Sequence, residues 1–299
     1  MYDIIVVGAG PAGISAGIYG VSRGKKVLIL EKGEVGGLIG KVSTVTHYAG
    51  IVPGETGDSF AARMREQAES AGVEIRPETV EQVQMQGDVK TVVTDQGRYT
   101  CKKLILANGT TGRKLGIPGE TELAGKGMGM NAAKHGANYA GKHVYVVGGA
   151  DGAVKEALYL SSLAEKVTII HFEPQLGCIA EFRDKVKKTR NIRLMLNTRL
   201  HAVRGEGQVE QLDLRSEVDG SISTVDDPGC GIFVYAGTVP NTQLYTELEL
   251  QNGYIPVNDW METSIPGVYA VGDIRVKQVR QVATAVADGA TAAVHACIG

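Results

Sequence analysis

The chain has 299 residues, of which 31 are basic and 33 acidic, so its formal net charge is −2. At about 150 residues per domain, this length suggests two domains. The small net charge gives no strong field for binding nucleic acid or an anionic membrane surface. Hydrophobic residues make up 43% and charged residues 21%, which excludes a disordered or fibrous chain. The 40 glycines greatly exceed the usual share of about 7%, so we expect many tight turns and close backbone approaches.

The four cysteines stand far apart in the sequence, at Cys101, Cys178, Cys230 and Cys297. No pair has the short spacing of a zinc site or a CxxC motif. Isolated cysteines suit a reducing compartment, so the sequence predicts a cytoplasmic protein. The amino-terminal residues lack a basic segment, and no apolar run reaches about 18 residues. Neither a signal peptide nor a membrane segment is predicted.

The amino-terminal segment combines a strand, a glycine-rich turn and a helix. Residues 2–7 form a short apolar run rich in β-branched residues, typical of a buried parallel strand. The sequence Gly-Ala-Gly-Pro-Ala-Gly follows at residues 8–13, and a helical stretch comes next. A second apolar run, residues 27–30, ends at Glu31. This is the dinucleotide-binding fingerprint in its full structural context.

Each residue of this fingerprint has a physical role. Gly8 allows the tight turn, Gly10 lets the backbone approach a pyrophosphate, and Gly13 lets helix and strand pack closely. The amino terminus of the helix faces the phosphates. Glu31, which lies 18 residues after Gly13, can accept the hydroxyls of a ribose. The sequence therefore predicts a bound dinucleotide.

The same pattern recurs later in the chain. A strand at residues 144–147 leads into Gly148, and a second strand at residues 167–170 ends at His171, 18 residues after Ala153. This second copy is degraded, because Ala150 stands where the middle glycine would admit a pyrophosphate and His171 stands where the acid would be. Either the copy still binds a nucleotide or it is a structural domain that binds nothing.

The regions around the two copies complete a domain plan. Residues 103–107 and 267–273 are predicted strands, and residues 281–293 have helical character. We therefore predict an α/β protein of two Rossmann-like three-layer nucleotide-binding domains, the second inserted in the first. The first domain comprises residues 1–112 and 242–299, and the second comprises residues 113–241.

Several segments together match one family. They are residues 8–13, Gly36-Gly37, residues 114–120, 156–160 and 240–242, and residues 272–275 with 280–285. With these segments the chain resembles the low-molecular-weight thioredoxin reductases across nearly its whole length. The resemblance implies that the first domain binds FAD and that the protein is a homodimer.

The resemblance also assigns residues to the two sites. Asp273 would hydrogen-bond the ribityl chain of the flavin, and the residues from Arg280 to Val282 would lie along the flavin itself, at the amino terminus of a helix. The residues expected to hold FAD are Gly8, Gly10, Pro11, Ala12, Gly13, Glu31, Gly36, Gly37, Leu38, Asn108, Gly109, Gly272, Asp273, Arg280, Gln281 and Val282. Those expected at the second site are Gly148, Ala150, Ala153 and Glu173.

The first departure from the family removes its redox centre. The CxxC motif and the acid after it are replaced by Asn131-Ala132-Ala133-Lys134 and His135. Disulfide reduction needs one thiolate to attack and a second thiol to resolve the mixed disulfide, so we expect no dithiol mechanism. Lys134 and His135 are candidate catalytic residues that tune the potential and protonation of the flavin. Alternatively, both face solvent.

The second departure concerns the nicotinamide nucleotide. The family reads the 2′-phosphate of NADPH with an HRRxxxR motif, but Phe172, Glu173 and Gly177 replace its three arginines. Glu173 would repel a 2′-phosphate, so NADPH is disfavoured. NADH stays compatible because Glu173 can accept a ribose hydroxyl, although His171 and Ala150 oppose it. The segment is also similar to that of NADH-using, peroxiredoxin-reducing flavoproteins.

The sequence thus predicts an FAD-dependent oxidoreductase without a redox dithiol, which passes electrons from a donor to a non-disulfide acceptor. The donor is NADH, or a reduced ferredoxin or flavodoxin. Such acidic carriers seek basic surface, and residues 183–190 are basic, although such a run is also typical of a solvated helix. Two alternatives remain: a flavin-binding sensor or assembly subunit without turnover, and a direct oxidase or dehydrogenase of an organic substrate.

Overall fold

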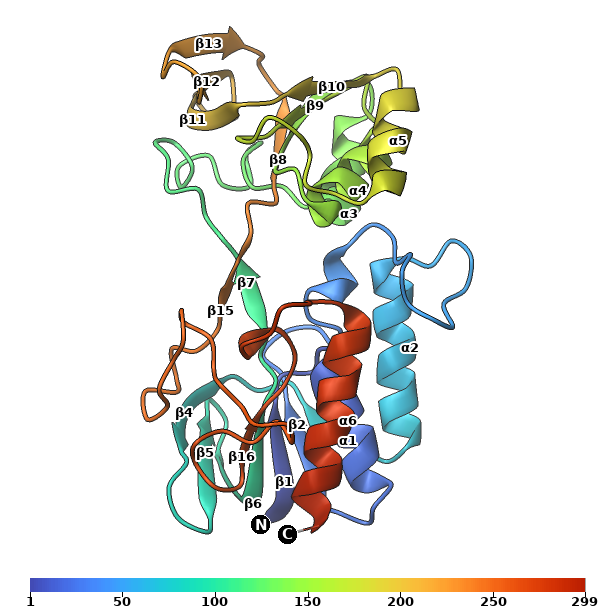
Figure 1. The fold of residues 1–299 in the computed structure, drawn as a ribbon, viewed down its shortest axis with the longest axis vertical. Coiled ribbons are helices and arrows are strands. Elements are labelled where there is room, and N and C mark those ends of the chain that lie inside the picture. Colours follow the sequence, from blue (N-terminus) through green and yellow to red (C-terminus); the bar gives the residue numbers. More distant parts are fainter. Residues whose placement is uncertain (299) are drawn as a thin grey trace. The chain divides into compact units, whose positions relative to one another are not determined.

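The computed structural model describes residues 1–298, which form two compact units (Figure 1). Unit 1 comprises Met1–Thr111 and the chain from Val239 onward, and unit 2 comprises Gly112–Thr238. The predicted domain boundaries differ from these by one residue at the first crossing and three at the second. The chain crosses between the units through β7 (Thr110–Gly112) and β15 (Thr238–Pro240), which pair with each other.

Unit 1 is built on a seven-stranded sheet of order β3-β2-β1-β6-β5-β4, in which β16 also pairs with β6. The strands are β1 (Tyr2–Val7), β2 (Val27–Leu30), β3 (Glu74–Arg76), β4 (Val80–Gln84), β5 (Lys90–Thr94), β6 (Arg98–Leu106) and β16 (Val268–Ala270). Strands β1, β2, β3, β6 and β16 are parallel, whereas β4 and β5 are antiparallel. The predicted strands at residues 2–7 and 27–30 are confirmed. Strand β6 starts earlier than predicted because its first residues pair with β5.

The helices of unit 1 are α1 (Pro11–Val21), α2 (Gly57–Ser70) and α6 (Val282–Ile298), with short 3₁₀ turns η1 (Ile39–Lys41) and η3 (Gly272–Ile274). Helices α1 and α6 lie side by side (Figure 1). Gly289 of α6 permits this close packing, because a Cβ at this position would lie 2.1 Å from the carbonyl oxygen of Ala12. The packing of α6 on α1 holds η3 beside the start of α1.

Unit 2 contains a parallel sheet of order β10-β9-β8-β14 and an antiparallel meander of order β11-β12-β13. The strands are β8 (His143–Val147), β9 (Lys166–Ile170), β10 (Ile192–Met195), β11 (Thr198–Arg204), β12 (Gln211–Ser216), β13 (Ile222–Asp226) and β14 (Gly231–Val234). The helical segments are α3 (Ala132–His135), η2 (Gly136–Tyr139), α4 (Asp151–Leu160) and α5 (Ala180–Lys188). One buried cluster lies on the helix side of the parallel sheet and another on the meander side.

Both parallel sheets, each with the strand–turn–helix unit predicted from its glycine motif, confirm the α/β class. Strands β8 and β9 each begin one residue before the predicted runs. Within residues 1–298, no helix is both long enough and apolar enough to cross a membrane.

Candidate functional site

The glycine turn after β1 has no room for side chains. Gly8 has a φ of +105°, and a Cβ on it would lie 2.6 Å from the carbonyl oxygen of Ala107. A Cβ on Gly13 would lie 1.9 Å from the carbonyl oxygen of Gly8. Gly10 caps α1, whose first turn contains Pro11 and no acidic residue. The amino terminus of α1 therefore presents backbone N–H groups to an anion without a competing negative charge.

This turn opens into a cavity of about 640 Å³ within unit 1. The cavity lies at the carboxyl ends of β1, β2 and β6, where parallel sheets commonly bind ligands. Of the sixteen residues that the sequence assigned to FAD, fourteen line it: Gly8, Gly10, Pro11, Ala12, Glu31, Gly37, Leu38, Asn108, Gly109, Gly272, Asp273, Arg280, Gln281 and Val282. The other two shape the backbone behind the lining: Gly13 under the turn, and Gly36, on which a Cβ would lie 2.5 Å from the Cβ of Ala61.

Two polar atoms beside this cavity are buried and have no hydrogen-bond partner among the described residues. They are Oδ1 of Asp273 and Nε of Arg280, and both residues line the cavity. Burial raises the pKa of the Asp273 carboxyl, and the nearby charges of Lys277 and Arg280 oppose that rise. Buried polar atoms in folded proteins are nearly always paired. An acceptor and a donor left unpaired in one cavity fit a ligand with both hydroxyl and carbonyl groups.

A buried ion cluster fixes the loop that carries Asp273. Asp288 of α6 accepts a hydrogen bond from the backbone N–H of Gly272 at 3.0 Å. The same carboxylate accepts from Arg275 at 2.7 and 2.8 Å and from Lys277 at 2.8 Å. These contacts lower the pKa of Asp288 despite its burial. These contacts hold the loop against α6. They do not involve the side chain of Asp273, which lines the cavity.

Two other residues that line the cavity, Glu31 and Asn108, already form hydrogen bonds within the protein. Glu31 accepts the backbone N–H groups of Ala9 and Gly33, each at 2.8 Å, which keeps its carboxylate at the end of β2 with lone pairs to spare. The side chain of Asn108 accepts from Tyr245 at 2.7 Å and donates to the carbonyl oxygen of Asn241 at 2.8 Å. Asn108 can therefore offer a ligand little beyond its backbone.

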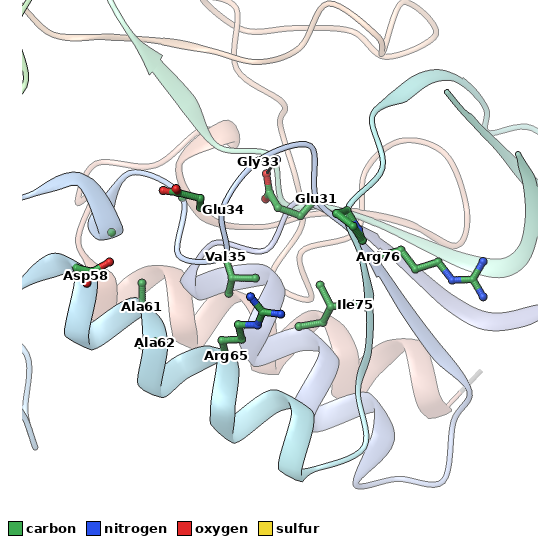
Figure 2. Close-up of a pocket in the computed structure, with 13 residues that line it drawn as sticks. Glu31, Gly33, Glu34, Val35, Asp58, Ala61, Ala62, Arg65, Ile75 and Arg76 are labelled. Atoms are coloured by element: carbon green, nitrogen blue, oxygen red, sulfur yellow. Dashed lines mark hydrogen bonds between the residues drawn. The ribbon is translucent and has the colours of Figure 1, made fainter. Parts of the chain in front are cut away.

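Glu31 also borders a second, smaller cavity of about 350 Å³ (Figure 2). Side chains from α2, among them Asp58 and Arg65, form one wall, and Ile75 of β3 forms another. In Figure 2 the guanidinium of Arg76 points away from this cavity, where it donates to Glu74 and to the hydroxyl of Tyr99. The Glu31 carboxylate therefore stands between the two cavities.

In unit 2 the second glycine turn keeps its backbone geometry. Gly148 has a φ of +133°, and a Cβ on it would lie 2.4 Å from the carbonyl oxygen of Tyr235. Ala150 caps α4 with φ −83° and ψ 175°, close to the −75° and −178° of Gly10. Ala153 is buried, as Gly13 is in the first copy. Unlike α1, however, α4 has an acid, Asp151, in its first turn, which disfavours a pyrophosphate there.

The residues after β9 form a specific arrangement around Glu173. His171 is buried, and its Nε2 lies 3.0 Å from Oε2 of Glu173, whose side chain is half exposed. The His171 ring packs on Gly149, where a Cβ would lie 2.5 Å from ring atoms. The guanidinium of Arg199 stacks on Phe172, 4.2 Å from the ring centroid, and pairs with Glu217. This arginine is thereby occupied in a cation–π contact and an ion pair.

The four cysteines are free thiols in four different parts of the structure. Cys101, Cys178 and Cys230 are buried in three separate hydrophobic clusters, and Cys297 packs against a fourth. Burial raises the pKa of Cys101 and of Cys230 to about 12, and it also raises the pKa of the other two thiols. None is a ready thiolate, and no two are placed as a pair.

Residues 131–135, which the sequence predicts to align with the family's CxxC motif, include a single helical turn in unit 2. Asn131 caps it by accepting the backbone N–H of Lys134 at 2.9 Å. The Nδ1 atom of His135 accepts the backbone N–H of Asn131 at 3.0 Å. Lys134 is exposed and His135 partly exposed. Asn131 and His135 thus close the turn with capping hydrogen bonds.

Comparison with known proteins identifies the family. A model described as pyridine nucleotide-disulphide oxidoreductase matches residues 2–289. The chain is 39% identical to a thioredoxin reductase of Peptoclostridium litorale, over 99% of this chain and 96% of that protein. This chain belongs to the pyridine nucleotide-disulphide oxidoreductases. These are FAD-binding oxidoreductases, and the low-molecular-weight thioredoxin reductases are the branch that it resembles.

Solved structures of thioredoxin reductases also match this chain along nearly its whole length. Thioredoxin reductase of Lactococcus lactis has 33% identity and a TM-score of 0.95, covering 99% of this chain and 98% of that one. A ferredoxin-flavin thioredoxin reductase of Clostridium acetobutylicum has 27% identity and a TM-score of 0.54, covering 99% and 97%. The predicted two-domain Rossmann-like fold is confirmed by these matches.

The unpaired Asp273 and Arg280 atoms and the glycine cradle fit the FAD expected of this oxidoreductase. Sequence reasoning missed part of the cavity wall: Glu78, Thr79, Val80, Thr110, Thr111, Gln243 and Leu244. These residues follow β3, β6 and β15 and carry no local motif. Only the position of these residues after strands could have indicated that they line the cavity, because the loops after parallel strands gather at one edge of a sheet.

Proposed function

We propose that this protein is an FAD-dependent oxidoreductase that passes electrons from a donor to a non-disulfide acceptor, without a redox dithiol. One combination of observations carries the proposal. The flavin cavity keeps its cradle and its unpaired polar atoms, whereas the four cysteines are separate and three are buried. A protein that has lost both flavin and disulfide chemistry would not need such a cavity, and a dithiol reductase would need paired thiols.

When bound, the flavin supplies the electron chemistry, and the protein binds and orients it. The start of α1 provides N–H groups for the pyrophosphate, and Glu31 provides a carboxylate for ribose hydroxyls. Asp273 would accept a hydrogen bond from a hydroxyl of the ribityl chain at its unpaired Oδ1. Arg280, fixed over Tyr254 at 4.3 Å from the ring centroid, offers its unpaired Nε as a donor.

NADH, rather than NADPH, is the nucleotide donor that the second copy favours. The side chain at Glu173 is an acid held by His171, and an acid near the 2′ position accepts a ribose hydroxyl but repels a phosphate. The guanidinium of Arg199, which stacks on Phe172, is paired with Glu217. Ala150 and Asp151 weaken pyrophosphate binding relative to the first copy, so we expect modest NADH affinity.

A reduced ferredoxin or flavodoxin is the second donor candidate. The observation that favours it is α5, whose last turn contains three lysines and which lies in the basic run 183–190. The similar Clostridium acetobutylicum structure is that of a ferredoxin-flavin thioredoxin reductase. An acidic carrier would dock on such a surface, and the rate of reduction would fall as salt is added.

Lys134 and His135 complete the proposal, because they align with the family's flavin-facing cysteine and the acid that follows it. A lysine charge beside a flavin stabilises its reduced, anionic form, and a histidine side chain can take or give a proton. The cytoplasmic location and the homodimer implied by the resemblance stay predictions.

The test is an anaerobic titration of the purified flavoprotein, followed by the absorbance of oxidised flavin. NADH, NADPH and reduced ferredoxin are added separately. Bleaching by NADH in preference to NADPH supports the second copy as the donor site. Bleaching by ferredoxin alone assigns the donor to a docked carrier. If no donor bleaches the flavin, the electron-transfer proposal is wrong, and a sensor or a direct oxidase of an organic substrate replaces it.

A further inference from the structure

The amino-terminal half of the parallel sheet in unit 2 carries polar side chains on one face. Tyr145 of β8 is in register with Thr168 of β9, and Thr168 is in register with Arg193 of β10. Two residues earlier along the strands, His143 is in register with Lys166. Registered side chains, and those two residues apart on a strand, lie on the same face of a sheet. These five side chains therefore form one polar patch.

This patch lines a cavity of about 490 Å³ that we name the basic cavity. Its wall is completed by the apolar residues Leu194, Met195 and Val225, the last from the meander strand β13. The glycine turn of unit 2 follows the opposite, carboxyl end of β8, and the His171–Glu173 pair follows the carboxyl end of β9. The basic cavity is therefore separate from the dinucleotide site. Its volume lies within the range of about 300–1,000 Å³ that is typical of small-molecule sites.

The hydrogen bonds at the base of the basic cavity have defined directions. Asp227 accepts from the Tyr145 hydroxyl at 2.8 Å and from Nδ1 of His143 at 2.5 Å. Since a carboxylate only accepts, neutral His143 carries its proton on Nδ1. Its Nε2 atom, 2.8 Å from the hydroxyl of Thr168, then accepts that hydroxyl's proton. Asp227 is thus satisfied by two donors, which leaves less of its charge to repel an anion.

The two cationic side chains that line the basic cavity, Lys166 and Arg193, form no ion pair within the described part of the chain. Within residues 1–298, neither the Lys166 ammonium nor the Arg193 guanidinium has a side-chain hydrogen bond or a carboxylate within 4.0 Å. Most exposed lysines in unit 2 that form pairs do so along a helix, as Lys185 does with Glu181. Here two unpaired cations from adjacent strands border one cavity beside a buried hydroxyl, that of Thr168.

We propose that the basic cavity binds a small organic anion. Its carboxylate or phosphate group is held by Lys166, Arg193 and the hydroxyl of Thr168, and its apolar body lies against the apolar part of the lining. An oxyanion matches these groups because charge-assisted hydrogen bonds from a guanidinium and an ammonium are the strong ones. The apolar wall selects an anion with a hydrocarbon or aromatic body over inorganic phosphate.

Binding is linked to the protonation of His143. When Nε2 of His143 gains a proton, it donates to the Thr168 oxygen, and the hydroxyl proton becomes free for the anion. The charged groups that act on His143 are Asp227 and Glu165, which favour its protonated form, and Lys166, which opposes it. Burial lowers the pKa of His143. A bound anion favours the protonated imidazole, so affinity rises as the pH falls.

The test measures binding by calorimetry on the flavin-loaded protein, with no nucleotide or reductant present. The probes are benzoate, phenyl phosphate, inorganic phosphate, and benzyl alcohol as the neutral analogue. We expect at least one aromatic anion to bind, with benzyl alcohol about tenfold weaker or worse. The preferred anion tells whether the natural ligand is a carboxylate or a phosphate. Affinity for benzoate should rise as the pH falls below the ordinary histidine pKa of about 6.5, because burial lowers the pKa of His143.

Three variants decide whether the proposed groups are responsible. Lys166→Gln combined with Arg193→Gln should weaken binding of the anion at least about tenfold, since each removes a charge-assisted bond. His143→Gln should remove the pH dependence. Lys126→Gln, at an exposed lysine of unit 2 outside the basic cavity, is the control and should change nothing. The proposal is overturned if no probe anion binds, if benzyl alcohol binds equally well, or if the double variant, folded by its Tm, binds as tightly as the parent.

Discussion

Replacing Asp273 tests the flavin cavity where its geometry is most specific. Oδ1 of this carboxylate is buried and has no partner among the described residues, and Asp273 lines the cavity. A hydrogen bond to a charged group contributes about 1.5–3 kcal/mol, against about 0.5–1.5 kcal/mol for a neutral pair. At about 1.4 kcal/mol per factor of ten, Asp273→Ala should weaken FAD binding about 10- to 150-fold. Asp273→Asn keeps a neutral acceptor and should lose only about 5- to 10-fold.

The stability of the flavin-free protein should change in the opposite direction. Burial raises the pKa of Asp273 in the folded state, so ionisation of this group opposes folding. That cost is absent below the unfolded pKa of about 3.9 and is complete above the folded pKa. The apoprotein of Asp273→Asn should therefore have a higher Tm than the parent at pH 7, and the gain should shrink toward about pH 4.

The assay is quenching of FAD fluorescence on titration into apoprotein, with Tm measured on the same samples. Asp259→Asn, an exposed acid in unit 1, is the matched control and should leave both quantities unchanged. The reasoning is refuted if Asp273→Ala binds FAD as tightly as the parent. It is also refuted if the alanine and asparagine variants are equally weak, because the retained acceptor would then have no effect.

Three further changes test separate parts of the account. Gly13→Ala places a methyl group 1.9 Å from the Gly8 carbonyl oxygen. The flavin content of the purified protein should therefore fall, and the free energy of unfolding should drop by about 1–3 kcal/mol. The control is Gly112→Ala, whose added methyl group would meet no atom within 4 Å, and it should retain its flavin. Glu173→Arg should raise NADPH reduction relative to NADH about tenfold or more in stopped-flow measurements, and an unchanged ratio, or an equal change in the exposed control Glu206→Arg, contradicts the role of Glu173. Lys134→Ala should lower the midpoint potential of the flavin in a redox titration, and an unaltered potential removes Lys134 from the mechanism.

The sequence predicted those parts of the fold that local patterns specify. Strands β1 and β2 were placed to the residue because each is a short buried apolar run. Strand β1 also leads into a glycine turn whose steric requirements only glycine meets. Strand β6 was predicted too short, because its first half is specified by pairing with β5 rather than by its own pattern.

The residues of the candidate site likewise divide into those that a local motif predicts and those that only the fold brings together. Residues of the glycine turn and of the loop at Asp273 were foreseen from motifs, and they line the cavity. The loop at Glu78 was missed, since its position depends on the order of strands in the sheet. Asn108 was expected among the residues that hold FAD, but its side chain is bonded to Tyr245 and Asn241, partners more than 130 residues away that no local pattern could reveal.

The pairing of His171 with Glu173 illustrates a third limit. Both residues were recognised as departures from the family, yet each was judged alone, the first as an obstacle to NADH and the second as its reader. In the structure they are one hydrogen-bonded pair. Contacts between neighbouring side chains depend on rotamers, which the sequence pattern does not specify.

The most direct test of the central claim is the number of electrons that the purified protein accepts. An anaerobic titration with dithionite, followed by flavin absorbance, counts electrons per bound flavin. A flavin alone takes up two electrons, and a redox-active disulfide takes up two more. The separate, buried cysteines predict that absorbance will stop changing at about two electrons per flavin and that no new thiols will appear. An endpoint of about four electrons, with two new thiols per chain, would contradict the account.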